Sequence, residues 1–141
     1  MANKYAGLGS QLKRGNGAVP EVFTTVPSCK TLDGPKLDST MIDTTTLDVT
    51  GGYETFVMGL KKPGTVSFLL MWDPGDATHQ ALFSDYDNKT LRNFEVVWPD
   101  LGSETFSFSA YVKMAQGKAE PNTPLTMQME LQISGPVTRT P

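Results

Sequence analysis

The residue types that most often carry out chemistry are sparse and unpaired in this chain. His79 is its only histidine and Cys29 its only cysteine. A catalytic nucleophile needs a base at a spacing that a fold can bring together, and neither residue stands in such a motif. We interpret His79 as a partly exposed helix residue and Cys29 as a small core or interface residue. Because the sequence also lacks CxxC, HExxH, phosphate-binding glycine loops and a nucleophile elbow, we predict no enzyme and no cofactor.

Two acidic segments resemble metal loops only in part. Asp38, Asp43 and Asp48 recur every five residues, whereas a calcium loop needs ligands at alternate positions and a closing carboxylate. Residues 85–88 also lack the glycine and the terminal glutamate of such a loop. The threonines between the first three acids favour an extended chain. We therefore predict no metal site.

Composition and charge exclude several classes of protein. The chain has 141 residues, of which 38% are hydrophobic and 19% charged, with a net charge of −3. This length suits one domain, which buries roughly 70% of the surface of its unfolded chain. No basic stripe is present that would release counterions from phosphates, which argues against a general nucleic-acid binder.

The sequence also bears on location. No run approaches the ~20 apolar residues of a membrane span, and the N-terminus lacks the apolar core of a signal peptide. We expect no membrane binding by this chain. It should stay in the cytoplasm unless it leaves as part of an assembly.

The apolar residues around the middle of the chain indicate two strands and a helix. Residues 53–60 and 66–72 are predicted strands, joined by a tight turn in which Pro63 fixes φ and Gly64 takes the positive φ of a type II turn. The second strand has almost no polar member, which favours cover on both faces. A helix is predicted over residues 76–86 with Asp76 as its N-cap, and this helix is expected to cover one of those faces.

The rest of the chain is predicted to be mostly strand. Shorter strands are expected at 19–26, 28–32 and 91–98. Residues 105–114 and 125–134 alternate apolar and polar for nine or ten positions, which is a strong strand signal. The inward set is Phe106, Phe108, Ala110, Val112 and Met114 on the first, and Leu125, Met127, Met129, Leu131 and Ile133 on the second. The predicted fold is mainly β: a single-domain sandwich or partly closed barrel of seven or eight strands with one inserted α-helix.

Two segments are predicted to lie outside this core. Residues 1–18 are glycine-rich and polar, so we expect a flexible arm before a domain at 19–141. Residues 36–52 look like a long loop or hairpin that leaves the sheet. The predicted assembly residues on these segments are Leu8, Leu12, Asp38, Met41, Ile42, Asp43, Leu47 and Asp48.

Aromatic residues leave a second functional alternative open. Tyr53, Trp72, Trp98 and Tyr111 could form a platform for sugar rings. The two tryptophans fall on the apolar sides of their strands, which favours core packing instead. The alternatives are therefore a self-associating β domain and a monomeric β-sandwich module that binds a carbohydrate or a host protein.

The order of the elements resembles the major tail tube proteins of long non-contractile-tailed phages, the lambda-like tail tube family. The resemblance runs from about residue 21 to 138, and its order and spacing matter more than any single motif. Its main segments are Gly59-Leu60-x-x-Pro63-Gly64-x-Val66-x-Phe68, Ala77-x-His79-x-x-Leu82 and Ser134-Gly135-Pro136-Val137.

This resemblance implies a structural virion protein. Such subunits form hexameric rings that stack into a tube, with their inner sheets joined as a barrel around the channel for genome delivery. The implied partners are further copies of the chain, a tape-measure protein, tail terminator and tail-tip proteins, and DNA in transit. The implied location is the virion tail, after assembly in the host cytoplasm. Strand faces suited to lining the lumen carry Ser107, Ser109, Thr126, Gln128, Glu130 and Gln132.

Overall fold

The computed structural model describes residues 9–48, 50–98 and 104–140, which form ten strands, one α-helix and one 3-10 turn. Some strands that are consecutive along the chain pair antiparallel through backbone hydrogen bonds, and the other pairs join strands that are far apart in the sequence. In order, they are β1 (Gln11–Gly15), β2 (Phe23–Thr25), β3 (Cys29–Asp33), β4 (Leu37–Asp43), η1 (Thr50–Gly52), β5 (Phe56–Pro63), β6 (Thr65–Met71), α1 (Ala77–Asp87), β7 (Arg92–Val97), β8 (Thr105–Lys118), β9 (Thr126–Ile133) and β10 (Thr138–Thr140).

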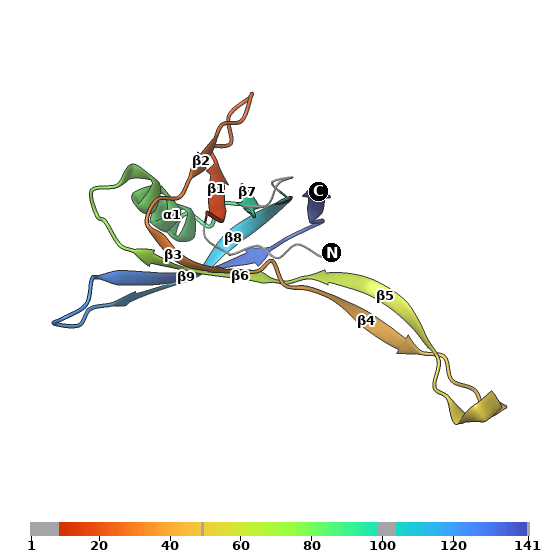
Figure 1. The fold of residues 1–141 in the computed structure, drawn as a ribbon. Coiled ribbons are helices and arrows are strands. Elements are labelled where there is room, and N and C mark those ends of the chain that lie inside the picture. Colours follow the sequence, from red (N-terminus) through yellow and green to blue (C-terminus); the bar gives the residue numbers. More distant parts are fainter. Residues whose placement is uncertain (1–8, 49, 99–103, 141) are drawn as a thin grey trace, which may run out of the picture.

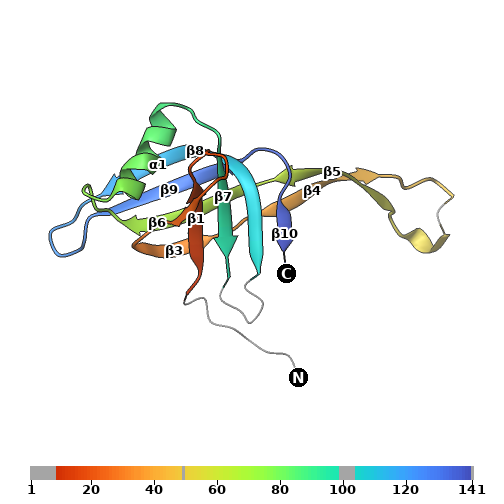
Figure 2. The ribbon, with the colours of Figure 1, turned by 90° about the horizontal axis from the view of Figure 1, so that it is seen from above.

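Eight of these strands form one antiparallel sheet that folds over at β8. Its order is β2-β1-β7-β8-β9-β6-β3, and β10 pairs with β8. The first part of β8 pairs with β7 and β10, whereas the part from Ala110 onward pairs with β9. Figure 2 shows β8 bending, so that one part runs with β1, β7 and β10 and the other with β9, β6 and β3. The result is two packed layers that share one strand, as predicted for a mainly β fold with one helix.

The core lies between these layers and beneath α1. Alternate residues of β6, β8 and β9 point into it, so the predicted period-two pattern is confirmed within β9 and in the first part of β8. Leu125, predicted to face inward, precedes β9 and is 45% exposed. Helix α1 covers the core side of the second layer (Figure 1), where Leu82 is fully buried. The buried apolar set is Leu12, Val26, Val66, Phe68, Leu70, Leu82, Phe94, Val96, Phe106, Phe108, Ala110, Val112, Met129, Leu131 and Ile133.

One predicted inward residue of β8 faces the other way. The register between β8 and β9 shifts between Val112 and Met114, so Met114 pairs with Glu130 and Ala115 with Met129. An extra residue in one strand reverses the alternation beyond it. Met114 therefore shares the outer face with Glu130, while Ala115 packs against the core.

The predicted central hairpin is wrong. β5 pairs with β4 and not with β6, and the chain passes from β5 into β6 through Gly64 without a reversal (Figure 1). Gly64 is required by a close approach: a Cβ there would lie 2.1 Å from the carbonyl oxygen of Lys36. The expected cover on both faces of β6 is also absent, because Met71 on its outer face is 45% exposed.

The N-terminal prediction also needs correction. Residues Gln11–Gly15 are not an arm but strand β1, which lies between β2 and β7 in the sheet. Leu12 is fully buried, so it belongs to the core and not to an assembly surface. Leu8 lies outside the described residues. The predicted strand at 19–26 shortens to β2, with Val19 almost wholly exposed and Val26 buried.

Candidate assembly surfaces

The β4–β5 hairpin projects from the end of the second layer (Figure 1) and forms a separate two-stranded sheet. Met41 pairs with Met58 and Ile42 with Val57, so neighbouring pairs point to opposite faces of the ribbon. All four side chains are more than half exposed. A two-stranded ribbon has no core of its own, and no layer formed by the described residues covers these apolar side chains. The hairpin is therefore an apolar surface on both of its faces.

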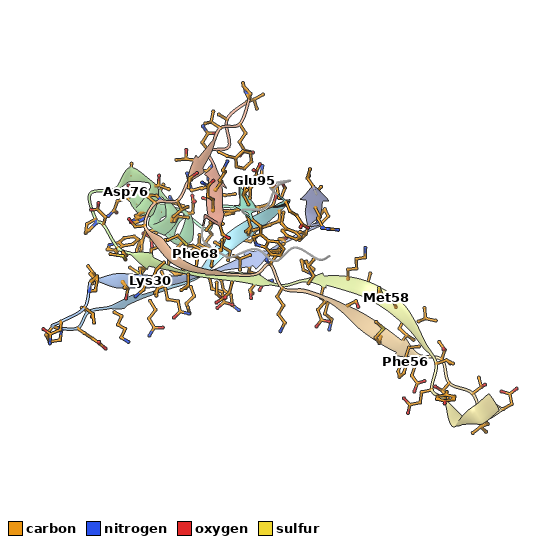
Figure 3. All side chains as sticks on the ribbon, in the orientation of Figure 1. Lys30, Phe56, Met58, Phe68, Asp76 and Glu95 are labelled. Atoms are coloured by element: carbon orange, nitrogen blue, oxygen red, sulfur yellow. The ribbon has the colours of Figure 1, made fainter. Side chains whose placement is uncertain are left out.

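The exposed apolar residues continue to the tip of the hairpin. Phe56 lies on the same face as Met58, and both project from the ribbon in Figure 3. Monomeric soluble proteins rarely expose a contiguous apolar patch of this kind, which makes the hairpin a candidate assembly surface. The exposed apolar residues of the projection are Leu37, Met41, Ile42, Leu47, Tyr53, Phe56, Val57, Met58 and Leu60.

Threonine and aspartate side chains order the tip. The Thr44 backbone N–H donates to the Thr55 carbonyl oxygen at 2.9 Å, and the Thr55 N–H donates to the Thr45 hydroxyl oxygen at 2.9 Å. Hydrogen bonds from Thr45 hold the pKa of Asp43 below its ordinary value, and the Thr46 hydroxyl does the same for Asp48. Both carboxylates are therefore ionised at neutral pH on a defined turn.

The structure brings most of the predicted assembly residues together. Asp38, Met41, Ile42 and Asp43 lie on β4, and Leu47 and Asp48 lie at the tip; all six are exposed. The apolar residues of β5 are not among the predicted assembly residues, because the sequence pattern placed residues 53–60 in a hairpin with 66–72. The sequence did contain one signal: residues 56–58 are apolar at three successive positions. A strand with one polar face alternates apolar and polar residues, so this run indicates apolar side chains on both faces.

The two predicted polar faces lie on the outer sides of different layers. Thr126, Gln128, Glu130 and Gln132 lie on the outer face of β9, in the second layer. Ser107 and Ser109 lie on the outer face of the first layer, where the Ser109 hydroxyl donates to Asn93 Oδ1 at 2.6 Å. A single lining surface can therefore include only one of these two sets.

The second layer has two open edges. β3 is the last strand in the sheet order, and among the described strands it pairs only with β6. Beyond Ala110, β8 pairs with β9 on one side, and no other strand of the described residues pairs with this part of it. Unpaired backbone N–H and C=O groups at such edges pair readily with another chain.

A buried ion-pair network fixes α1 to the first layer. Asp85, only 3% exposed, accepts hydrogen bonds from Arg14 of β1 and from Arg92 of β7. Arg92 also donates to the Asn16 carbonyl oxygen at 3.0 Å. These contacts hold the body of the subunit together and place the helix over the core.

The single histidine, His79, is fully buried, contrary to the expected partial exposure, and it links three segments of the fold. His79 Nδ1 accepts from the Asp73 N–H at 3.1 Å, so its Nε2–H donates to the Pro27 carbonyl oxygen at 2.8 Å. Its ring stacks on Trp72 with a centroid separation of 5.3 Å. Asp76 is the N-cap, as predicted, and accepts from the N–H groups of Thr78 and His79.

Other kinds of site are not assembled by the described residues. No group of three His, Cys, Asp or Glu side chains among them is placed to hold a metal ion. None of the helices formed by residues 9–48, 50–98 and 104–140 is long and apolar enough to span a membrane.

Comparison with solved structures places this fold among tubes and related tail assemblies. The chain is similar to a protein of the tail of an empty gene transfer agent particle, with a TM-score of 0.82 and 15% identity over 98% of this chain and 100% of the other. A chain of the native gene transfer agent virion gives 0.80 and 14%, with coverage of 98% and 100%. The SPP1 tail tube protein gives 0.67 and 14%, with coverage of 96% of this chain and 78% of that one.

Sequence comparison points to the same family. No curated protein matches the chain. The model of the family described as "Phage tail tube, TTP, lambda-like" matches residues 12–105, about two thirds of the sequence. This match covers strands β1 to β7, helix α1 and the projecting hairpin. The chain therefore belongs to the lambda-like phage tail tube protein family, whose members are structural proteins of the tail.

Proposed function

We propose that six copies of this chain close into a ring and that the rings stack into a tail tube. The open edges of the second layer provide the means of ring closure, because β3 of one subunit can pair with the later part of β8 in the next. One solved tail of similar fold has C6 symmetry. Closing six such layers into a barrel removes every free edge of that layer.

The outer face of the second layer is the proposed lumen lining. Thr126, Gln128 and Gln132 are uncharged, and Glu130 pairs with Lys113 at 3.6 Å. A channel for DNA must not hold phosphates tightly. Glu130 offsets the charge of Lys113 on this face, and Lys30 and Lys118 lie at its rim, beside Thr126 and Gln128. Ser107 and Ser109, which lie on the other layer, are then on the outside of the tube.

The projecting hairpin is the proposed link between rings. Its exposed apolar faces are not covered by any residue that the structure describes, and it extends beyond the end of the second layer (Figure 1). Burial of this surface in a neighbouring ring stabilises the stack, since apolar burial contributes about 25 cal/mol per Å². The hairpin residues Met41, Ile42, Leu47, Phe56 and Met58 are the main anchors of this contact.

The remaining partners follow from the role of a tube. The lumen surrounds a tape-measure protein during assembly and the genome during delivery. The two ends of the tube contact a terminator and tail-tip proteins. Assembly takes place in the host cytoplasm, and the finished tube is part of the virion tail.

The observation that carries this proposal is the unpartnered hairpin on a tail-tube fold with open sheet edges. Negative-stain electron microscopy of the purified chain at high concentration tests it. Rings or long hollow tubes are expected. A monodisperse monomer at every concentration, particularly one that binds a glycan, would support the alternative of a monomeric binding module.

A further inference from the structure

The hairpin tip and a groove lie at opposite ends of the same ribbon of strands. β3 continues into β4 and β5 into β6, so the ribbon runs from the tip to the far end of the second layer (Figure 1). At that far end lies a groove of about 660 Å³ between the start of β3 and the β8–β9 connection. Figure 3 shows Lys30 at this end and Phe56 near the other. A shift along the ribbon axis therefore brings the tip of one copy toward the groove of the next.

The tip is acidic and apolar. Residues 37–60 contain Asp38, Asp43, Asp48 and Glu54 but no Lys, Arg or His. Leu47 is fully exposed and Tyr53 is 77% exposed. The tip thus presents carboxylates around protruding apolar side chains, in a turn that its own hydrogen bonds keep in shape.

The groove has the complementary chemistry. Its charged lining residues are Lys30, Lys118 and Glu120, so the groove carries a net positive charge, and Leu69 and Pro124 add apolar surface. Lys118 lies 3.3 Å from Glu120, but both side chains are at least half exposed, so water and salt screen this pair. Met71, on the same strand face as Leu69, adds exposed apolar surface at this end.

We propose that the hairpin tip of one copy docks in the Lys30–Lys118 groove of a second copy in the adjacent ring. Asp43 and Asp48 face the two lysines, and Leu47 and Tyr53 pack on Leu69 and Pro124. The two surfaces are different and lie at opposite ends, so the contact is head-to-tail and generates an open stack. This inference rests on the proposed ring and tube, and it assigns the receiving surface within them.

The groove lies at the rim of the proposed lumen face. Thr126 and Gln128 line both, so a docked tip covers them, whereas Glu130 and Gln132 remain in the channel. The same contact is repeated around the ring. Salt screens the proposed ion pairs in this contact, so stacking should weaken as the salt concentration rises.

Charge reversal on each surface tests the pairing. The groove variant is Lys30→Glu with Lys118→Glu, and the tip variant is Asp43→Lys with Asp48→Lys. All four side chains are exposed, so the body of the protein should keep its circular dichroism spectrum and melting temperature in each variant. Asp43 and Asp48 also accept hydrogen bonds within the tip, so recovery of tubes by the mixture described below is the result that separates charge pairing from a change in tip structure. Negative-stain microscopy at low salt should show rings without tubes for each variant alone. A mixture of the two should recover tubes of alternating rings, because each tip then meets an opposite charge.

The other outcomes separate the pairing from the proposed function. If the groove variant alone grows tubes like the wild type, the groove is not the receptor, whereas the role of the hairpin stands if the tip variant fails to stack. Failure of the mixture to recover tubes overturns the pairing of these charges. Lys89→Glu, an exposed change after α1, controls for net charge, and an equal loss of tubes from it also overturns the pairing. If the wild type forms neither rings nor tubes, the proposed function itself fails.

Discussion

Arg14 on β1 and Asp85 on α1 are 71 positions apart in the sequence and form a two-pronged ion pair. Arg14 Nε donates to Asp85 Oδ2 at 2.6 Å, and Arg14 Nη2 donates to Oδ1 at 2.9 Å. This contact ties the first strand of the chain to the inserted helix. It also explains why the polar N-terminal segment is ordered at Gln11–Gly15, since Arg14 has a buried carboxylate to satisfy there.

Asp85→Ala should therefore destabilise the fold strongly. It removes the shared partner of Arg14 and Arg92 and leaves two partly buried guanidinium groups unpaired. We expect a loss of about 3 kcal/mol in the free energy of unfolding, measured by urea denaturation. Asp87→Ala, in the same helix but exposed, should change it by less than about 0.5 kcal/mol. Equal effects of the two substitutions would contradict a structural role for the ion pair.

His79→Phe should also lower stability, through lost hydrogen bonds. The phenyl ring keeps an aromatic partner for Trp72 but leaves the Pro27 carbonyl and the Asp73 N–H without their imidazole partner. We expect a cost of about 2 kcal/mol, measured by chemical denaturation. Ser84→Ala, an exposed change on the same helix, serves as the control. A variant as stable as the wild type would show that these hydrogen bonds contribute nothing net.

Gly64→Ala tests the close approach at the root of the hairpin. The new Cβ would lie 2.1 Å from the Lys36 carbonyl oxygen, so the backbones of the two strands must separate. We expect a destabilisation of at least about 1–3 kcal/mol and weaker amide protection at the hairpin root by hydrogen exchange. Gly117→Ala is the matched control, since its nearest neighbour is 3.9 Å away. If both variants behave alike, the strands do not approach this closely.

The tip of the hairpin should lose the hydrogen bonds that Asp43 accepts when the pH falls. Hydrogen bonds from Thr45 depress the pKa of Asp43 in the folded state, so their stabilisation is complete above the unfolded value and is lost as pH falls through the folded one. The loss should therefore occur below about pH 4. An NMR titration of the Asp43 carboxyl measures it, and Thr45→Val should raise that pKa. No change in Thr45→Val would show that the Thr45 hydroxyl is not the cause, since the variant keeps the backbone N–H that also donates to Asp43.

Much of the fold could be predicted because one face of each long strand meets this chain's own core. The alternation along β8 and β9 and the N-cap at Asp76 are local signals, and both are confirmed. Met114 was placed wrongly because a single inserted residue reverses the alternation and leaves no mark in the sequence pattern.

The hairpin was harder to predict, for a physical reason. An apolar run such as residues 56–58 has the same pattern whether it is covered by its own chain or by another copy. Pro63-Gly64 then favoured a turn, although Gly64 is there to let two backbones pass closely. Leu12 was missed for the opposite reason: one buried leucine in a polar segment carries little periodic signal.

In the proposed assembly, the exposed hairpin joins rings of this chain into a tube. The most direct measurement is negative-stain electron microscopy of the wild type beside Ile42→Ser with Met58→Ser, which makes one apolar side chain on each face of the hairpin polar. Both side chains are more than half exposed, so the fold should survive, as circular dichroism can verify. If the hairpin joins the rings, the wild type should form hollow tubes and the variant should form separate rings. Tubes of equal length from both proteins, or monomers alone from the wild type, would contradict it.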